Sequence, residues 1–415
     1  MIIDYRARQQ GRAIYLIAGQ KATHTMPLKT SSQVRDGNLP ACISTPADLD
    51  FLDPANPFFV TDRALLSYGQ FIGGSTPKGI FQHTRPGVTI LGDSGGFQLI
   101  SNASLWQGNA TRAQALTWLE ANTNEAMTLD IPTMAIAKGN PLFPTFDDCL
   151  NTTLANNAFF QRHRTGQTRF LSVVQGRDRK EAVAWLNAIM AHPFDGWAVG
   201  GDMRDNYVWL VELLVRLRAA GLMGDRNRLH VLGCSTLTHA VMLSAIQKSF
   251  RELPGEAGFL ITFDTSNPSQ QMAFGRLVGR PRITKDRGTV PGDFVMTSYQ
   301  TPTHTDHSPS DPRSLPIKSS RISERLTIGE LCAYPNPGKS SAWDTFAEAI
   351  IVHHNLDATL AAIDEANSIL EMPSVFAQQI APTRIIRAYE VLRSIFQQPD
   401  PVSYARSYAK LFLTL

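Results

Sequence analysis

Polar and small residues stand directly after short apolar runs at several places in this chain of 415 residues. The residues that share this position are Asp62, Asp93, Asp130, Gln175, Gly200, Gly201, Cys234 and Asp264. If the runs are neighbouring parallel strands, these side chains meet at one end of the sheet. Carboxylates gathered in one place raise each other's pKa, and folding does not need them there. The pattern therefore predicts a functional site whose carboxylates serve as acids, bases or nucleophiles.

The strongest local motif is GDSGGFQ at residues 92–98, in which Asp93 is followed by Ser94 and two glycines. Glycines there let backbone amides come close to a planar or anionic ligand. Phe97 could stack on a nucleic-acid base. The alternative is an ordinary tight turn that needs glycine for a positive φ, and for the glycines alone both interpretations stay open. The heptapeptide as a whole favours a binding site.

The elements that would position these residues are eight short apolar runs, at 13–19, 57–62, 88–96, 127–132, 170–176, 196–201, 229–234 and 259–264. Runs this short and this apolar are typical of parallel strands buried on both faces. Several gaps between them have apolar residues at helical spacing, at 179–191, 206–221 and 237–250. Strands that alternate with helices predict an α/β fold, either a (β/α)8 TIM barrel or a doubly wound open sheet. The count of eight favours the barrel, whose active site lies at the carboxyl ends of the strands.

The amino-acid composition of the sequence changes after Asp264. Residues 265–340 are rich in Ser, Thr, Pro, Gly and Arg, which predicts loops around the barrel mouth, whereas residues 342–370 and 382–397 have helical patterns. We therefore expect a catalytic barrel domain at 1–290, an irregular loop region at 291–340 and a C-terminal helical subdomain at 341–415.

Composition limits the classes of partner. The net charge is only +3 and charged residues make up 18% of the chain, so a nucleic acid would need a local basic patch. The candidates for phosphate contacts are Arg276, Arg280, Arg282 and Arg287, although a solvated charged loop is the usual fate of such residues. The four cysteines form no CxxC pair, and there is neither a secretory signal nor an apolar run of about 18 residues. These features predict a cytoplasmic protein with no membrane partner.

GDSGGFQ resembles the signature of the queuine and archaeosine tRNA-guanine transglycosylases. The motifs VVQG (173–176), AVGG (198–201), LGCST (232–236) and TFDTSNPS (262–269) follow in the order of that family. The resemblance extends roughly from Ile14 to His354, which is most of the chain. Within this superfamily, the chain is most similar to the DNA-guanine transglycosylases of bacteria and phages, which insert 7-deazaguanine bases into DNA.

The resemblance implies a role for each matching residue. Asp264 would be the nucleophile that attacks the sugar C1′ and displaces guanine, leaving a covalent glycosyl–enzyme. Asp93 would be the general acid and base, in a retaining double displacement with a purine as the second acceptor. The implied base-binding residues are Phe97, Asp130, Gln175, Gly200, Gly201, Ser94 and Gly95. From the residues alone, Asp130 could instead cap a turn, and Gln175 could hydrogen-bond the backbone.

The chain departs from the family at the zinc site, which is usually CxCxxC with a later histidine. The corresponding residues here are Cys332 and His354 alone, too few for a tetrahedral zinc site, so we predict no zinc cofactor. A second departure is Asp202, a carboxylate directly after the glycine pair, where the tRNA enzymes usually carry an apolar residue.

The missing zinc motif favours DNA over tRNA as the substrate. The first hypothesis is an enzyme, a pentosyltransferase, that exchanges guanine in DNA for 7-cyano-7-deazaguanine or a relative. Its partners would be DNA, a free 7-deazaguanine base and proteins that give access to the DNA. The alternatives are a divergent tRNA-guanine transglycosylase, a non-catalytic substrate-binding paralogue and a barrel glycoside hydrolase. Both Asp93 and Asp264 are present, which counts against the non-catalytic paralogue.

Overall fold

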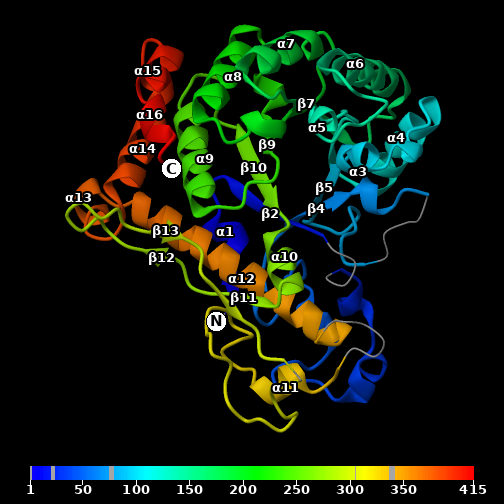
Figure 1. The fold of residues 1–415 in the computed structure, drawn as a ribbon, viewed down its shortest axis with the longest axis vertical. Coiled ribbons are helices and arrows are strands. Elements are labelled where there is room, and N and C mark those ends of the chain that lie inside the picture. Colours follow the sequence, from blue (N-terminus) through cyan, green and yellow to red (C-terminus); the bar gives the residue numbers. More distant parts are fainter. Residues whose placement is uncertain (1, 20–23, 74–78, 304, 336–341) are drawn as a thin grey trace.

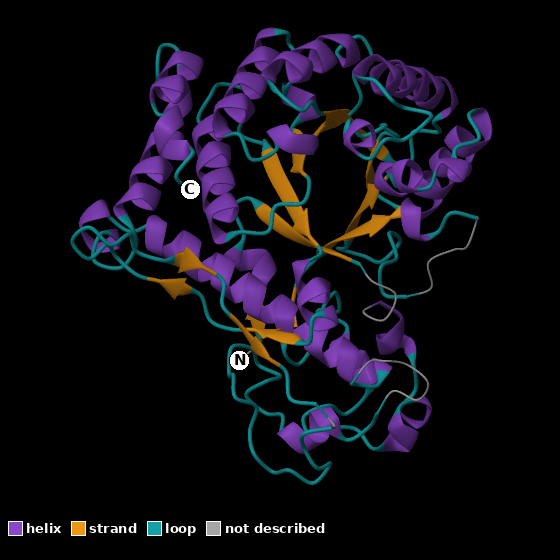
Figure 2. Ribbon diagram, in the orientation of Figure 1, coloured by secondary structure: helices purple, strands orange, loops and turns teal. Residues whose placement is uncertain are grey.

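The computed structural model describes residues 2–19, 24–73, 79–303, 305–335 and 342–415. Its centre is a closed barrel of eight parallel strands in the order β10-β2-β4-β5-β6-β7-β8-β9 (Figures 1 and 2). The strands are β2 (Ile14–Ala18), β4 (Arg63–Ser67), β5 (Thr89–Asp93), β6 (Glu125–Met127), β7 (Arg169–Val174), β8 (Gly196–Val199), β9 (Arg228–Val231) and β10 (Leu260–Thr265). The predicted TIM barrel is confirmed.

The helices around the barrel follow the strands in sequence. They are α3 (Gly96–Ser101) and α4 (Asn109–Asn122) after β5, α5 (Met134–Ala137) and α6 (Phe146–His163) after β6, α7 (Arg179–Ile189) after β7, α8 (Tyr207–Ala219) after β8 and α9 (Leu237–Arg251) after β9. Polar caps fix where several of them begin. The side chains of Asp178, Asn206 and Thr236 accept hydrogen bonds from the first turns of α7, α8 and α9. These caps place the helices directly after the strand ends that form the barrel mouth.

The inside of the barrel holds its own small apolar cluster, made of Leu16, Leu65, Leu91, Met127, Leu171, Val173 and Ala198. Side chains of a strand alternate between the two faces of the sheet, so every second residue points inward. The residue two positions after Leu65 is Ser67, and the residue two positions after Leu91 is Asp93. The same alternation places polar side chains above the apolar cluster, toward the carboxyl ends of the strands.

The second predicted strand is wrong. Of residues 57–62, only Phe59–Val60 form a strand, β3, and it pairs with β1 (Ile3–Asp4) outside the barrel. Its Phe59 is buried against Tyr5, which begins α1 (Tyr5–Arg8), and against Phe51. The true barrel strand, β4, follows it directly. Similarly, the run at 127–132 only begins in a strand, because β6 ends at Met127.

The segment after β10 is more regular than the loops that we expected. It contains α10 (Asn267–Ala273) and α11 (Ile328–Cys332), and two antiparallel pairs of short strands, β11 (Arg276–Val278) with β14 (Ser298–Gln300) and β12 (Arg282–Ile283) with β13 (Phe294–Val295). Strands of two or three residues are too short to give a readable alternation of polar and apolar residues. Pairing of β11 with β14 also crosses residue 290, the expected end of the barrel domain; the domain boundaries remain a prediction.

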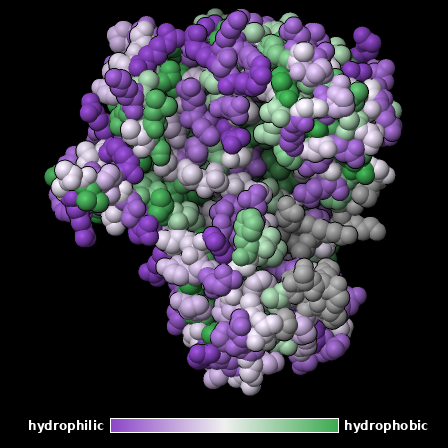
Figure 3. Space-filling view, viewed as in Figure 1, coloured by the Kyte–Doolittle hydropathy of each residue, from purple (hydrophilic) through white to green (hydrophobic). Residues whose placement is uncertain are grey.

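The C-terminal region is helical, as expected: α12 (Thr345–Leu370), α13 (Ser374–Ala377), α14 (Thr383–Arg393), α15 (Pro401–Ser407) and α16 (Ala409–Phe412). Helix α12 crosses below the barrel against α9, α10 and β11, while α14 and α15 stand beside α9 and α8 (Figure 1). The described residues contain no helix that is long and apolar enough to cross a membrane. Hydrophilic side chains cover most of the visible surface, with smaller apolar patches between them (Figure 3).

Candidate functional site at the barrel mouth

Asp264 lies near the end of β10 and is held by groups on the neighbouring strand β9 and in the loop that follows it. Its Oδ1 accepts a hydrogen bond of 2.9 Å from the Gly233 amide and lies 3.3 Å from Nε2 of His230. The other ring nitrogen of His230, Nδ1, lies 2.9 Å from the Thr262 hydroxyl. Because a carboxylate accepts, Nε2 carries the proton and Nδ1 accepts from Thr262 when the imidazole is neutral. The carboxylate of Asp264 is therefore fixed by two donors and is only 9% exposed.

Asp93 ends β5 on the inner face of the barrel. The hydroxyl of Ser67, its partner in the β4–β5 register, donates to Oδ2 over 2.6 Å, and the Gly95 amide donates to Oδ1 over 3.3 Å. Burial raises the pKa of Asp93, Ser67 and Gly95 oppose that rise, and the charge of Asp264 adds to it. Asp264 is paired with the inward Leu16, and Asp93 lies two residues after the inward Leu91, so both carboxylates point into the barrel near the carboxyl ends of the strands. Asp93 holds its proton more tightly than an ordinary aspartate.

Asp130 follows β6 and joins the same group of carboxylates. Burial raises its pKa to about 7, and the charge of Asp93 contributes to that rise. The Ser94 hydroxyl, also buried, faces Asp130 and lowers its pKa slightly, although it forms no hydrogen bond of ordinary geometry. Asp130 can therefore exist in both protonation states near neutral pH, so it can either donate or accept a hydrogen bond.

Gln175, directly after β7, is the buried partner of Asp130. Its Nε2 donates to Asp130 Oδ2 over 2.7 Å and to the Ile131 carbonyl over 3.1 Å. Its Oε1 accepts from the Thr133 amide over 2.8 Å. The whole carboxamide is used to hold the loop that carries Asp130, which supports the structural interpretation of Gln175.

The glycines of the GDSGGFQ motif are needed for close packing. Gly95 has φ +77, and a Cβ there would lie 2.6 Å from the backbone nitrogen of Gly69. A Cβ on Gly96 would lie 2.7 Å from the carbonyl oxygen of Asp130. The tight turn and the site are thus one arrangement, because this packing brings the loop after β5 against the loop after β6.

Of three other expected base contacts, Gly200 and Phe97 have partners within the protein. The Gly200 amide donates to the Val174 carbonyl over 3.0 Å, and Gly201 has φ +69 in the left-handed region. Phe97, in the first turn of α3, is 51% exposed, and the Lys138 ammonium lies 3.7 Å from the centre of its ring. A base that stacked on this face of Phe97 would have to displace Lys138. The roles of these residues remain predictions.

The four candidate arginines are exposed and lie on or beside the short strands that follow α10. Arg282 pairs with Asp293 over 2.7 Å, and the backbone of Arg287 pairs with that of Val290 in an isolated β-bridge. Arg276 begins β11, and Arg280 lines a cavity. They are spread over this segment, and one of them already has a carboxylate partner; their phosphate contacts remain a prediction.

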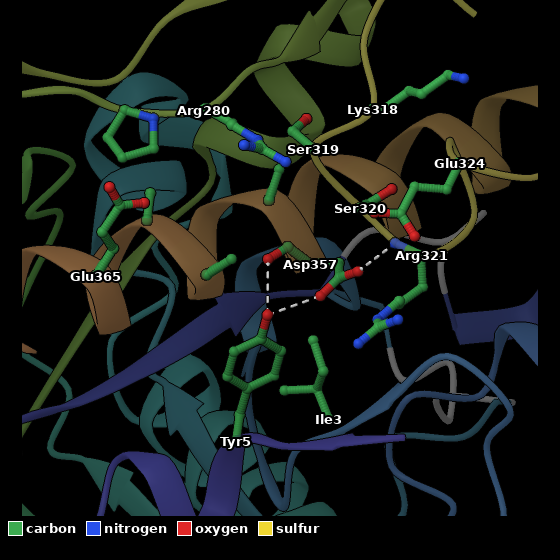
Figure 4. Close-up of a pocket in the computed structure, with 14 residues that line it drawn as sticks. Ile3, Tyr5, Arg280, Lys318, Ser319, Ser320, Arg321, Glu324, Asp357 and Glu365 are labelled. Carbon is green, nitrogen blue, oxygen red and sulfur yellow. Dashed lines mark hydrogen bonds between the residues drawn. The ribbon is translucent and has the colours of Figure 1, made fainter. Parts of the chain in front are cut away.

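The cavity beside Arg280 has a volume of about 360 Å³ and lies between α12 and the N-terminal strand β1 (Figure 4). The Tyr5 hydroxyl and the Arg321 amide both donate to the Asp357 carboxylate, over 2.8 and 3.0 Å. Burial raises the pKa of Asp357 to about 6. The side chains that line the cavity are balanced in charge, with cations at Arg280, Lys318 and Arg321 and acidic groups at Glu324, Asp357 and Glu365. This balance gives no preference for phosphate.

Asp62 is a correction to the expected set. It precedes β4, and its carbonyl accepts from the amide of Thr89, the first residue of β5. It therefore lies at the amino ends of the strands, on the opposite side of the barrel from Asp93. The error follows directly from the misplaced second strand.

The two remaining residues of interest both lie in loops of the barrel mouth. Cys234 is buried in the loop after β9, and Asp202 is exposed in the loop after β8.

The zinc position implied by the resemblance does not fit the residues found there. His354 uses both ring nitrogens, with Nδ1 2.6 Å from the Ser320 hydroxyl and Nε2 donating to the Val278 carbonyl over 3.0 Å. Burial raises the pKa of the Cys332 thiol to about 11. Within the described part of the chain, neither residue belongs to a group of three side chains close enough to share a metal ion. Part of the 330–341 segment lies outside the described residues.

Sequence reasoning missed three groups that contact the two central aspartates: Ser67, His230 and the Gly233 amide. Ser67 was hidden by the misplaced second strand. His230 carried a readable signal, since it is the polar residue within the otherwise apolar run 229–232. The contact from Gly233 depends on how the loop after β9 turns, with Gly233 at φ +69, and no sequence pattern gives that geometry.

Fold and site together define a (β/α)8-barrel protein with three buried or half-buried carboxyl groups at the carboxyl ends of its strands. No protein-family model and no curated protein sequence matches this chain.

Proposed function

We propose that this protein exchanges guanine in DNA for a 7-deazaguanine base, 7-cyano-7-deazaguanine or a relative, through a covalent aspartyl–glycosyl intermediate. The observation that carries the proposal is the pairing of Asp264 with Asp93. They face one space at the barrel mouth, but Asp264 is fixed by two N–H donors, whereas the pKa of Asp93 is raised. Two carboxylates in such different environments suit the roles of nucleophile and proton carrier.

The first half-reaction forms the intermediate. A carboxylate oxygen of Asp264 attacks C1′ of the deoxyribose, and the bond from C1′ to guanine N9 breaks with its electrons going to the base. Protonated Asp93 delivers its proton to the leaving guanine, for which a raised pKa is an advantage. His230 and Gly233 hold the attacking carboxylate in place during this step.

The second half-reaction reverses the first with a new base. Asp93, now ionised, removes the N9 proton of the incoming 7-deazaguanine. N9 then attacks C1′ and releases the Asp264 carboxylate, so the configuration at C1′ is retained after two inversions. Asp130, with a pKa of about 7, would bind the polar edge of either base.

The substrate would be a guanine that has left the base stack. A carboxylate 9% exposed at the barrel mouth cannot reach a C1′ within an intact duplex, so the target must be flipped out or single-stranded. Partner proteins that open the duplex would supply this state, in the cytoplasm. The misfit of Cys332 and His354 to zinc favours DNA over tRNA, which leaves a divergent tRNA-guanine transglycosylase as the second candidate.

A base-exchange assay tests the proposal. Duplex DNA, single-stranded DNA and tRNA with labelled guanine would each be incubated with the protein and 7-cyano-7-deazaguanine. We expect release of label from DNA only. Release from tRNA alone would replace the first candidate by the second. Release from none of the three, also in the presence of a cell extract that supplies partners, would support the non-catalytic paralogue and overturn the proposal.

A further inference from the structure

A second group of chemically reactive side chains lies at the barrel mouth, on the side of β8 and β9. It comprises Asp205, in the turn that leads into α8, Cys234, in the loop after β9, and His239, in the first turn of α9. One potential ligand atom from each of the three lies within 4.8 Å of those of the other two. The carboxylate, thiol and imidazole come from two separate barrel loops, so the fold brings them together.

The three ligand types match one class of ion. Thiolate, imidazole and carboxylate together suit zinc and similar divalent transition metals, whereas calcium and magnesium prefer oxygen ligands alone. Around a tetrahedral zinc ion with bonds of about 2.0–2.3 Å, ligand atoms lie about 3.3–3.6 Å apart. Separations of up to 4.8 Å would therefore have to shorten by as much as about 1.5 Å, while His239 Nε2 and Asp205 Oδ1, 3.0 Å apart, would move slightly apart. Three protein ligands leave the fourth position open for water or an external ligand.

The imidazole is already oriented by a neighbouring group. Nδ1 of His239 lies 2.7 Å from the hydroxyl of Thr236, and Nε2 lies 3.0 Å from Asp205 Oδ1. With its proton on Nδ1 and donated to Thr236, the ring turns the lone pair of Nε2 toward the centre of the cluster. Thr236 itself is fixed as the N-cap of α9, because its hydroxyl accepts from the His239 amide.

Exposure increases across the cluster in one direction. Cys234 is 1% exposed, the His239 side chain 17% and the Asp205 side chain 49%. A cation can therefore reach the cluster from solvent past Asp205 and end against the buried thiol. One group opposes it: Nε of Arg204 lies 3.6 Å from Asp205 Oδ1 and competes for that carboxylate.

We propose that Cys234, His239 and Asp205 form a binding site for a divalent transition-metal ion of the zinc class. The ion would join the loop after β8 to the loop after β9, one residue from the Gly233 amide that holds Asp264. This site is separate from the Cys332 and His354 position, and the proposal does not depend on the transglycosylase reaction. In the absence of an ion, Asp205 and His239 remain in direct polar contact over 3.0 Å.

Cobalt spectroscopy tests the proposal with the full-length chain. The protein would be stripped with a chelator and titrated with Co²⁺, whose thiolate complexes absorb in the near ultraviolet and whose visible bands report tetrahedral geometry. We expect one equivalent to bind with both signals and to be displaced by Zn²⁺. Cys234→Ser should abolish the thiolate band, while His239→Ala and Asp205→Asn should each weaken binding by about tenfold or more.

Matched controls separate this site from the other cysteines and from misfolding. Cys332→Ser and Cys42→Ser should leave the spectrum unchanged, and Arg204→Gln should tighten binding because it frees Asp205. Asp205 is exposed, so Asp205→Asn should fold normally and remains informative even if the buried Cys234→Ser variant does not. The proposal is overturned if the wild-type chain gives no thiolate band, if Cys332→Ser removes it, or if Asp205→Asn and His239→Ala bind cobalt as tightly as the wild type.

Discussion

Two regions of this molecule bury polar side chains in different ways. At the barrel mouth, Asp93, Asp130 and Asp264 lie at or just after the carboxyl ends of β5, β6 and β10. Burial raises the pKa of Asp93 and of Asp130, and the charge of a neighbouring carboxylate adds to each rise. On α12, Asn355 has only complementary partners. Its carboxamide accepts from the Val278 amide over 2.7 Å and donates to the carbonyls of Pro268 and Arg276.

The difference distinguishes a candidate functional site from a group of hydrogen bonds that only connects two segments of the fold. Buried polar groups with a full set of partners connect segments and stabilise the fold. Buried groups that oppose one another cost stability and persist at functional sites. His354 fits the first class, because its two ring nitrogens meet the Ser320 hydroxyl and the Val278 carbonyl. His353 does not, since both of its ring nitrogens are buried without a hydrogen-bond partner among the described residues. Burial lowers the pKa of His353 to about 3 and that of His354 to about 4, which keeps both neutral. Substitutions in the two regions should therefore affect different properties.

The largest effect is expected from Asp264→Asn. The amide oxygen can still accept from Gly233, so the fold should persist, but the proposed nucleophile is lost. We expect base exchange to fall by about a thousandfold or more and the covalent complex with DNA to disappear from denaturing gels. Asp62→Asn, at the opposite end of the barrel, is the matched control and should react as the wild type does. A covalent complex that survives Asp264→Asn would show that another group is the nucleophile.

Asn355→Ala should damage the other region. Three hydrogen bonds between α12 and the segment after β10 would be lost, leaving buried backbone groups without partners. We expect the free energy of unfolding to fall by about 2–4 kcal/mol, measured by urea denaturation. The control is Asn367→Ala on the same helix, equally buried, whose amide donates only to Ile363 within α12. An equal loss in both variants would mean that burial, and not the bonds between segments, stabilises this region.

Much of this arrangement could be predicted from the sequence, for a physical reason. Parallel strands buried on both faces leave continuous apolar runs, and six of the eight runs overlap their strands well. The second run, at 57–62, led to a wrong strand because it contains Phe58 and Phe59 and is as apolar as the barrel strands are. The true barrel strand, β4, begins with the charged residue Arg63. An apolar run indicates that a segment is buried, but it does not show whether the segment is a strand of the barrel or is packed outside the barrel.

The site residues also fall into those that the sequence could predict and those that it could not. Asp93 and Asp264 could be placed because each ends an apolar run, and alternation along β9 would also have found His230. The bond from Ser67 to Asp93 needed the register between β4 and β5, which pairs these two residues and which no single strand encodes. Gln175 was found but its orientation was not, since its partner Asp130 lies on a loop whose course depends on tertiary packing.

A smaller effect is expected from His230→Ala. If this imidazole positions Asp264, its loss should lower kcat by roughly tenfold to a hundredfold while KM changes little, because the buried ring lies out of reach of the proposed DNA substrate. His230→Gln keeps an N–H donor and should recover part of the rate. Steady-state exchange kinetics of the two variants decide between positioning and plain structural support, for which both variants would lose stability and rate together.

The smallest effect concerns the pKa of Asp130, about 7 in the folded protein against an ordinary value of 3.8. Because the folded state holds this proton more tightly than the unfolded state, its contribution to stability is full below about pH 4 and is lost as pH rises to about 7. Asp130→Asn should remove this part of the pH dependence. Asp93→Asn should lower the pKa of Asp130, because it removes a neighbouring negative charge, and carbon-13 NMR of the aspartate carboxyl groups would measure that shift directly. If the pKa of Asp130 did not move in Asp93→Asn, burial alone would account for it, and the mouth would lack the charge opposition that distinguishes it from α12.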